Sequence, residues 1–242
     1  MPGPQLWIAN LGTMPYGEAL ELQRSVAAAR ISGAIPEDIL LLVEHPPVVT
    51  LGRSSKEGHL TISRELLAER GVELFEVERG GDITFHGPGQ IVGYPIVDLK
   101  RHKQDLHWYL RQVEEALIRA LFALGITADR NPGYTGVWTN GRKIASIGVH
   151  ARDWVTWHGF ALNVTTDLNY FNLIVPCGIQ GVTMTSVERE IGAGAPKDIL
   201  GLASSALAAV FGDVFALEPV CVSAASALGA GLTASAANRT PL

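Results

Sequence analysis

The chain has 242 residues, of which 47% are hydrophobic and 18% are charged, and its formal net charge is −5. This balance is typical of a globular protein with a buried core and excludes a disordered chain. The net negative charge argues against a nucleic-acid-binding surface, which needs an excess of basic residues. No apolar run reaches the roughly 18 residues that a membrane-spanning helix needs.

The first ten residues, MPGPQLWIAN, lack the basic start and the long apolar run of a signal peptide. The sequence therefore predicts a cytoplasmic protein, in a compartment that keeps its two cysteines reduced. A disulfide between Cys177 and Cys221 is not expected. One catalytic domain is expected over residues 1–217, followed by an Ala/Ser-rich, mobile tail over residues 218–242.

The first eighty residues alternate between strand and helix patterns. Short apolar runs predict strands over residues 7–10, 39–44, 48–51 and 72–77. A helix is expected from about Tyr16 to Gly33, because apolar residues recur on one face there. A second helix is expected over residues 61–70, with Thr61 or Ser63 as its N-cap.

A glycine-rich segment, RGGDITFHGPGQ at residues 79–90, holds four glycines in twelve residues. Glycines at this density let a ligand lie close against the backbone, although an ordinary hairpin with glycine in its turns fits the same pattern. Arg79 and His86 at the two rims offer hydrogen-bond donors to a carbonyl or carboxylate, which favours a binding site. The segment matches neither the phosphate-binding P-loop nor the Rossmann fingerprint, so nucleotide binding has no support from it.

The middle of the chain contains the most regular helix. It is expected from Asp105 to Gly125, with these apolar residues on one side: Leu106, Tyr109, Leu110, Val113, Leu117, Leu121 and Leu124. Before it, a strand over residues 91–99 is expected to break at Pro95. The basic run at residues 100–103 is usually a solvated feature, but it could also steer an acidic partner protein.

An Asn140-Gly141 turn between two apolar runs predicts a β-hairpin over residues 136–149, and another strand is expected at residues 156–164. Lys143 enters an apolar part of this hairpin. Burial favours the neutral form of a lysine, which can take a proton from a thiol. Alternatively, Lys143 is a surface residue whose aliphatic stem covers the hairpin edge.

Cys177 lies between Pro176 and Gly178, a sequence typical of a tight, irregular turn. Backbone N–H groups rather than bulky neighbours would surround its sulfur, which favours a reactive thiol. The alternative is a buried thiol that acts as a small hydrophobic residue. Beyond it, a helix is expected over residues 196–211 and a short strand over residues 214–217.

Four motifs occur in this order along the chain: RGGDITFHGPGQ, GVWTNGRKIASIGVHAR, HGFALN and PCGIQGVTMTSV. With them the chain resembles the lipoyl(octanoyl) transferases over roughly residues 7–217. The resemblance implies an α+β fold, a single domain of the biotin/lipoate protein ligase type in which α-helices flank a mixed, mostly antiparallel β-sheet. It also implies an acyltransferase that moves an octanoyl group from octanoyl-acyl carrier protein to a lysine of lipoyl domains, in the first step of endogenous lipoate biosynthesis.

The same resemblance implies partners and residue roles. The expected acceptors are the lipoyl domains of 2-oxoacid dehydrogenase complexes and glycine-cleavage H protein, with no nucleic-acid or membrane partner. No cofactor and no metal is expected, because the phosphopantetheine of acyl carrier protein carries the acyl group. Cys177 would be the thioester-forming nucleophile, and Lys143 the group that activates it and carries protons. The family's substrate-contacting segments fall on Arg79, Gly80, Gly81, Asp82, Ile83, Thr84, Phe85, His86, Ser146, Ile147, Gly148, Gly159, Phe160 and Ala161.

Departures from the family pattern are few. Asp82 occupies a variable position, Val187 stands where leucine is more familiar, and the C-terminal tail is longer than usual. None of these changes affects Cys177 or Lys143, so the implied chemistry stands.

Three alternative functions remain open. An ATP-dependent lipoate-protein ligase on the same fold would need a nucleotide site. A noncatalytic acyl-binding protein would need an apolar channel but no reactive thiol. A zinc hydrolase would bring together ligands that are far apart in the sequence, namely His86, His150, His158 and Cys177. No CxxC or HxxxH spacing supports such a metal site.

Overall fold

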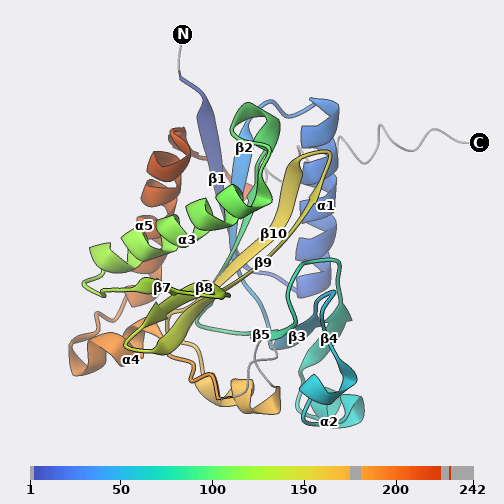
Figure 1. Ribbon diagram of the computed structural model, residues 1–242, viewed down its shortest axis with the longest axis vertical. Coiled ribbons are helices and arrows are strands. Elements are labelled where there is room, and N and C mark those ends of the chain that lie inside the picture. The colour runs from blue at the N-terminus through green and yellow to red at the C-terminus, as the bar shows by residue number, and fades with distance from the viewer. Residues whose placement is uncertain (1–2, 175–180, 225–228, 230–242) are drawn as a thin grey trace, which may run out of the picture.

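A large twisted β-sheet runs through the middle of the computed structural model, which describes residues 3–174, 181–224 and 229 (Figure 1). Within these residues the sheet has eight strands, in the order β11-β1-β2-β6-β10-β9-β8-β7. Its strands are β11 Glu218–Cys221, β1 Gln5–Thr13, β2 Asp38–Glu44, β6 Gln90–Ile96, β10 Val155–Asn163, β9 Arg142–Arg152, β8 Tyr134–Thr139 and β7 Asp129–Asn131.

A second, smaller sheet has the order β4-β3-β5 and consists of β3 Val48–Leu51, β4 Glu73–Glu76 and β5 Ile83–His86. The helices of the described residues are α1 Tyr16–Ser32, α2 Arg64–Glu69, α3 Leu106–Ala123, α4 Val187–Ile191 and α5 Ile199–Phe215. Short 3-10 helices lie at Glu57–His59, Leu99–Arg101, Leu168–Leu173 and Gly192–Gly194. None of the described helices combines the length and the hydrophobicity needed to cross a bilayer.

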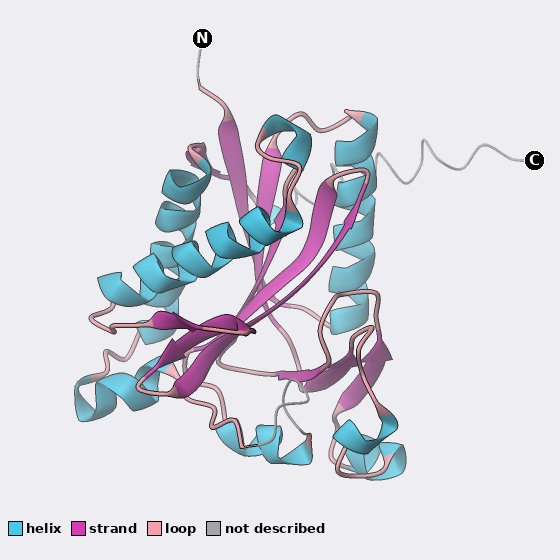
Figure 2. Ribbon diagram, viewed as in Figure 1, coloured by secondary structure: helices cyan, strands magenta, loops and turns pink. Residues whose placement is uncertain are grey.

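Strand pairing in the large sheet is mixed. β1 pairs in parallel with both β2 and β11, whereas each of the other neighbouring pairs is antiparallel. Helices cover both faces of this sheet (Figure 2). The expected α+β domain with a mixed, mostly antiparallel sheet flanked by helices is therefore confirmed.

The two faces of the large sheet pack against different elements. Leu40 and Leu42 of β2 join the hydrophobic core beneath α3 and α5, whereas Ile39 and Leu41 join the core beneath α1. Since successive residues of a strand point to opposite faces, a strand buried on both sides reads as a continuous apolar run. The smaller sheet lies beside α1 (Figure 1) and packs against it. The large and the smaller sheet therefore approach each other on the α1 side of the large sheet, where a cavity can form between them.

Local signals located most elements correctly. α1 begins at Tyr16, and Gly33 follows it in the left-handed conformation, with a φ of 78°. Asp105 caps α3 by accepting the N–H groups of His107 and Trp108. The Asn140-Gly141 turn joins β8 to β9 as expected.

The expected break at Pro95 is wrong, because β6 continues through it to Ile96 and Pro95 pairs with Leu40. The carbonyl of Pro95 faces β10, where it accepts the hydroxyl of Thr156 at 2.9 Å. Regular pairing between β6 and β10 covers only Gly93 to Gln90 opposite Phe160 to Asn163. Proline has no backbone N–H to donate. At Pro95 this side of the backbone faces a part of β10 outside the regular pairing, so the sheet loses no ladder hydrogen bond there.

The strand expected at residues 214–217 is also misplaced, since Val214 and Phe215 belong to α5. Phe211 and Phe215 lie one turn apart and are both buried, so packing prolongs the helix. The closing strand is β11, which pairs with β1 and takes residues 218–221 out of the expected tail. Residues 225–228 and 230–242 of that tail lie outside the described residues.

Candidate active site

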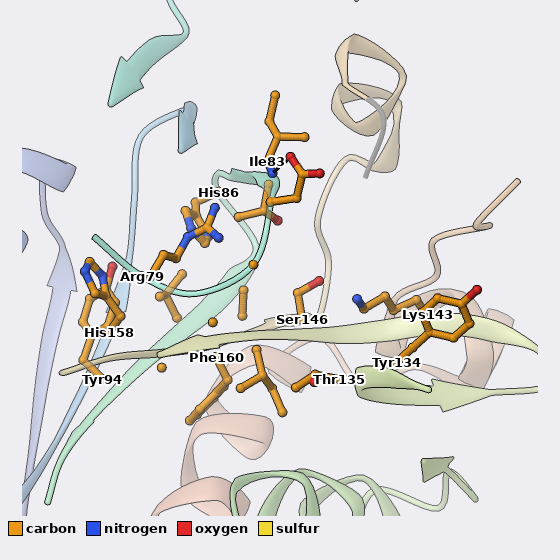
Figure 3. Close-up of a pocket in the computed structure, with 18 of the residues that line it drawn as sticks. Arg79, Ile83, His86, Tyr94, Tyr134, Thr135, Lys143, Ser146, His158 and Phe160 are labelled. Atoms are coloured by element: carbon orange, nitrogen blue, oxygen red, sulfur yellow. Dashed lines mark hydrogen bonds between the residues drawn. The ribbon is translucent and has the colours of Figure 1, made fainter. Parts of the chain in front are cut away.

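A cavity of about 310 Å³ lies between the large sheet and the glycine-rich segment that leads into β5 (Figure 3). It is lined by Tyr16, Arg79, Gly81, Asp82, Ile83, Thr84, His86, Val92, Tyr94, Gly133, Tyr134, Thr135, Lys143, Ser146, Ile147, Gly148, His158, Gly159, Phe160 and Ala161. The volume is at the small end of the range for small-molecule sites.

Small residues on three neighbouring strands form the floor of this cavity. Ser146 of β9 pairs with Ala161 of β10, and Ala161 pairs with Val92 of β6, so the three form one row across the sheet. Two residues further along β9, Gly148 pairs with Gly159 of β10. A Cβ atom on Gly148 would lie 2.8 Å from the carbonyl oxygen of Gly80, so glycine is needed for the opposite wall to approach.

The guanidinium of Arg79 is held in place by the smaller sheet. Its Nη2 donates to the carbonyl oxygen and to the hydroxyl of Thr50, both at 2.8 Å, and its Nη1 donates to the carbonyl oxygen of Gly80 at 3.1 Å. Because the side chain is buried and anchored on β3, it presents a fixed positive charge in the wall of the cavity.

His86 is neutral, and its tautomer follows from its neighbours. Its Nδ1 lies 2.7 Å from Oε1 of Gln90, whose amide nitrogen donates to Asn163 and to the carbonyl oxygen of Phe85. Nδ1 therefore carries the proton and Nε2 remains an acceptor. Burial lowers the pKa of His86 to about 3, with the nearby His45 as a further cause.

Polar but uncharged groups complete this end of the cavity. The hydroxyl of Tyr94 lies 2.7 Å from Nε2 of His45, whose Nδ1 lies 2.7 Å from the carbonyl oxygen of Met14. Burial lowers the pKa of His45 to about 4 and that of His158 to about 3, and it raises the pKa of Tyr16 to about 12. These groups therefore keep their neutral forms at neutral pH.

Lys143 lies at the other end of the cavity, with only 2% of its surface exposed, so the alternative of a surface lysine is wrong. Its Nζ lies 4.9 Å from the centre of the Trp138 ring, and Figure 3 shows the side chain directed toward Ser146. Its backbone N–H donates to the carbonyl oxygen of Thr183, and its carbonyl oxygen accepts the N–H of Thr185, both at 2.9 Å.

The predicted nucleophile, Cys177, lies outside the described residues, as do Pro176 and Gly178. Its role stays a prediction. The described segments on both sides are anchored, because Ile174 forms a β-bridge with Leu60 and Met184 forms one with Lys143.

The predicted substrate-contacting residues line the cavity, except Gly80 and Phe85. Gly80 donates its N–H to the carbonyl oxygen of Val149 at 2.8 Å, which ties the glycine-rich segment to β9. The ring of Phe85 stacks on Tyr170 at 4.6 Å, in a separate hydrophobic cluster. Whether these residues contact a substrate stays a prediction.

Sequence reasoning missed several lining residues, namely Tyr16, Val92, Tyr94 and Gly133 to Thr135. Val92 and Tyr94 are alternate residues of one strand and therefore share a face. This pattern predicts that both line the same surface, but only the pairing of β6 with β10 shows that the surface is the cavity. His150, one of the candidate ligands in the zinc-hydrolase alternative, contacts the Trp157 ring and does not line the cavity. Among the described residues, no three acidic, His or Cys side chains are grouped so that they could hold a metal ion.

Comparisons with known proteins agree with this architecture. The model of the lipoyl protein ligase A/B catalytic domain matches residues 15–200. An octanoyltransferase of Rubrobacter xylanophilus is 54% identical over 76% of this chain and 83% of its own. An octanoyltransferase of Koribacter versatilis is 53% identical over 76% of this chain and 75% of its own. A solved bipartite lipoate protein ligase of Thermoplasma acidophilum shares the fold, with a TM-score of 0.70 at 16% identity over 96% of this chain and 91% of its own.

The chain therefore belongs to the lipoyl protein ligase A/B catalytic-domain family. Its similarity to the curated octanoyltransferases makes it an acyltransferase, which transfers octanoyl groups in protein lipoylation. The predicted family, the enzyme class and octanoyl transfer in protein lipoylation are thus confirmed.

Proposed function

We propose that this enzyme transfers the octanoyl group in two steps, through a thioester on Cys177, with Lys143 as the proton carrier. The donor is octanoyl-acyl carrier protein, and the acceptors are lysines on the lipoyl domains of 2-oxoacid dehydrogenase complexes and on glycine-cleavage H protein. The observation that carries the proposal is the burial of Lys143 in the cavity wall, bonded to the segment that follows Cys177 in the chain.

In the first step, the Cys177 thiolate adds to the thioester carbonyl of the donor. The C–S bond to phosphopantetheine breaks, and the leaving thiolate takes a proton from the Lys143 ammonium. The products are an octanoyl-Cys177 thioester and free carrier thiol. Lys143 is then neutral and ready to accept a proton.

In the second step, a neutral lysine of the acceptor protein attacks the octanoyl-Cys177 carbonyl. The C–S bond breaks and regenerates the Cys177 thiolate, while Lys143 takes the proton that the new amide nitrogen loses. Because a thioester is exchanged for an amide, the reaction needs neither ATP nor another cofactor.

The choice of acceptor rests on the relatives. The structural relative of Thermoplasma acidophilum is described together with its E2 lipoyl domain. Residues 100–103 are a weaker candidate for steering an acidic partner in this proposal, because two of their side chains pair with acidic residues of this chain. His102 Nε2 lies 2.8 Å from Asp38 Oδ2, and Lys103 Nζ lies 3.2 Å from Asp105 Oδ2.

The acyl-enzyme can be detected by intact mass. The protein is incubated with octanoyl-acyl carrier protein without nucleotide and in the presence of a chelator, and the expected result is one octanoyl adduct on Cys177. Adding a lipoyl-domain protein should move the octanoyl group to that protein. A Cys177→Ala variant should form no adduct and transfer nothing. Transfer by this variant at the wild-type rate, or a strict need for ATP, would refute the proposal.

A further inference from the structure

Glu114 is an acidic residue at a buried position of a helix, where an apolar residue is expected. It belongs to α3, lies beside Val113 on the face that packs against the core, and is 0% exposed. Taking a carboxylate out of water is unfavourable unless charged and hydrogen-bonding partners offset the lost hydration. Its position therefore needs a reason in the surrounding contacts.

The two carboxylate oxygens of Glu114 have different hydrogen-bond partners. Oε2 accepts from Arg111 and from Nε of Arg130, the latter at 3.1 Å. Oε1 accepts the backbone N–H of Gly136 at 3.2 Å. The arginines offset the buried charge, and this leaves Oε1 to fix one backbone atom of β8.

Gly136 is the contact between this network and Lys143. Its φ of 132° is a conformation that side chains rarely adopt, and a Cβ atom there would lie 2.9 Å from Cε of Lys143. It would also lie 2.6 Å from the carbonyl oxygen of Ala145 and 3.3 Å from the Trp138 ring. The end of the Lys143 side chain is thus bounded by Gly136 and Trp138.

The same strand also builds the wall of the cavity. Gly133, Tyr134 and Thr135, which lead into Gly136, line the cavity next to Lys143, and Figure 3 shows Tyr134 beside the lysine. Pairing between β8 and β9 is irregular between Val137 and Trp138, so the sheet ladder alone does not fix Gly136. A buried hydrogen bond from α3 supplies the missing constraint.

We propose that Glu114 is a positioning residue, which fixes Gly136 through Oε1 and thereby directs Nζ of Lys143 into the cavity. The inference rests on the proposed function, in which Lys143 carries the proton. Glu114 acts through Gly136 and does not take part in the proton transfers.

The test compares Glu114→Ala with Glu115→Gln in steady-state octanoyl transfer from octanoyl-acyl carrier protein to a lipoyl domain. Glu115 is the matched control, because it also pairs with Arg130, at 2.9 Å, but has a 31% exposed side chain and does not reach Gly136. Misplacing a catalytic group by about 1 Å can cost about 100-fold in rate. We expect Glu114→Ala to lower kcat about 10- to 100-fold, to change KM for the donor less than about 2-fold, and to shift the pH profile of kcat. Glu115→Gln should behave as wild type.

A second variant keeps the test decisive if Glu114→Ala does not fold. Glu114→Met keeps the approximate size of the side chain but removes the oxygen that accepts the N–H of Gly136, so it should show the same fall in kcat and the same shift in pH profile. Glu114→Gln keeps an amide oxygen for that N–H and should restore most of the wild-type kcat. Wild-type kcat and pH profile in folded Glu114→Ala, or in Glu114→Met where Glu114→Ala is unfolded, would overturn the inference.

Lys143→Met is measured in parallel to separate this inference from the proposed function. If Lys143→Met transfers at the wild-type rate, the proposed proton carrier is wrong and the positioning role falls with it. If Lys143→Met is slow while Glu114→Ala is unaffected, only the positioning role is wrong.

Discussion

Lys143 combines two features that rarely occur together, a charged side chain and almost complete burial. Its contacts come from two parts of the chain: from β8, through the ring of Trp138 and the backbone of Gly136, and from the segment around Met184. The β8 contacts belong to the hairpin itself, whereas the contact with Met184 does not follow from its local pattern. Such a costly placement is expected for a residue with a chemical role.

Replacing this lysine should separate activity from stability. In Lys143→Met the side chain keeps its approximate size but loses its charge, so we expect transfer to slow at least about 100-fold. The free energy of unfolding should be unchanged or higher, because a buried charge is often replaced by an apolar group without loss. Both are measured, by single-turnover kinetics and urea unfolding. Lys197→Met, at an exposed site, is the control and should change neither.

At the level of elements, the cavity floor depends on how closely β6, β9 and β10 approach. The ring of Phe160 lies over Gly93 and stacks on Phe211 of α5, with ring centres 5.3 Å apart. Gly159 faces the backbone of Gly93 and the ring of Pro95. These glycines thus let aromatic side chains of one face pack without pushing the strands apart.

Gly93→Ala should disturb this contact strongly. A Cβ atom at this position would lie 2.1 Å from the Phe160 ring, so the ring or the strand must move. We expect the free energy of unfolding to fall by about 1–3 kcal/mol, as for other overpacked cores. Urea unfolding measures this. Gly194→Ala, where nothing lies within 4 Å of the added atom, should stay within about 0.5 kcal/mol of wild type. Equal stability of the two variants would show that the close approach is unimportant.

At the scale of the whole molecule, α1, the small sheet and the large sheet meet in a cluster of polar groups, of which His45, His86 and His158 are buried. Glu78 joins α1 to β10, since it accepts from Nε and Nη2 of Arg24, at 3.0 and 2.7 Å, and from the Trp157 indole at 3.0 Å. Burial alone would raise the pKa of Glu78, but these hydrogen bonds lower it to about 2. His158 Nε2 lies 3.8 Å from Glu78 Oε2, and burial holds His158, His86 and His45 neutral.

This cluster predicts how stability depends on pH. The unfolded chain protonates these three histidines below about pH 6.5, whereas the folded protein protonates them only near pH 4 or 3. Because the unfolded state binds more protons, the free energy of unfolding should be constant above pH 7 and fall as the pH drops from about 6.5 toward 4. Urea unfolding at several pH values measures the slope. His158→Gln should reduce it by about one proton. A flat profile between pH 5 and 7 would contradict the prediction.

The sequence by itself determined the order and type of most elements and the motif residues that line the cavity. Periodicity, caps and the Asn140-Gly141 turn act within a few residues, so they can be recognised without the rest of the chain. The errors at Pro95 and at residues 214–217 arose where pairing with β2 and helix packing overrode those local signals. They are corrected by contacts between distant residues.

Only the tertiary structure decided which strands are neighbours. The placement of β6 between β2 and β10 brings Val92 and Tyr94 to the cavity, and the packing of α1 brings Tyr16. The packing of α3 against β8 likewise brings the Glu114 carboxylate to Gly136. The physical reason is that such contacts join residues far apart in the chain. Their stability depends on the whole packed core rather than on any local preference.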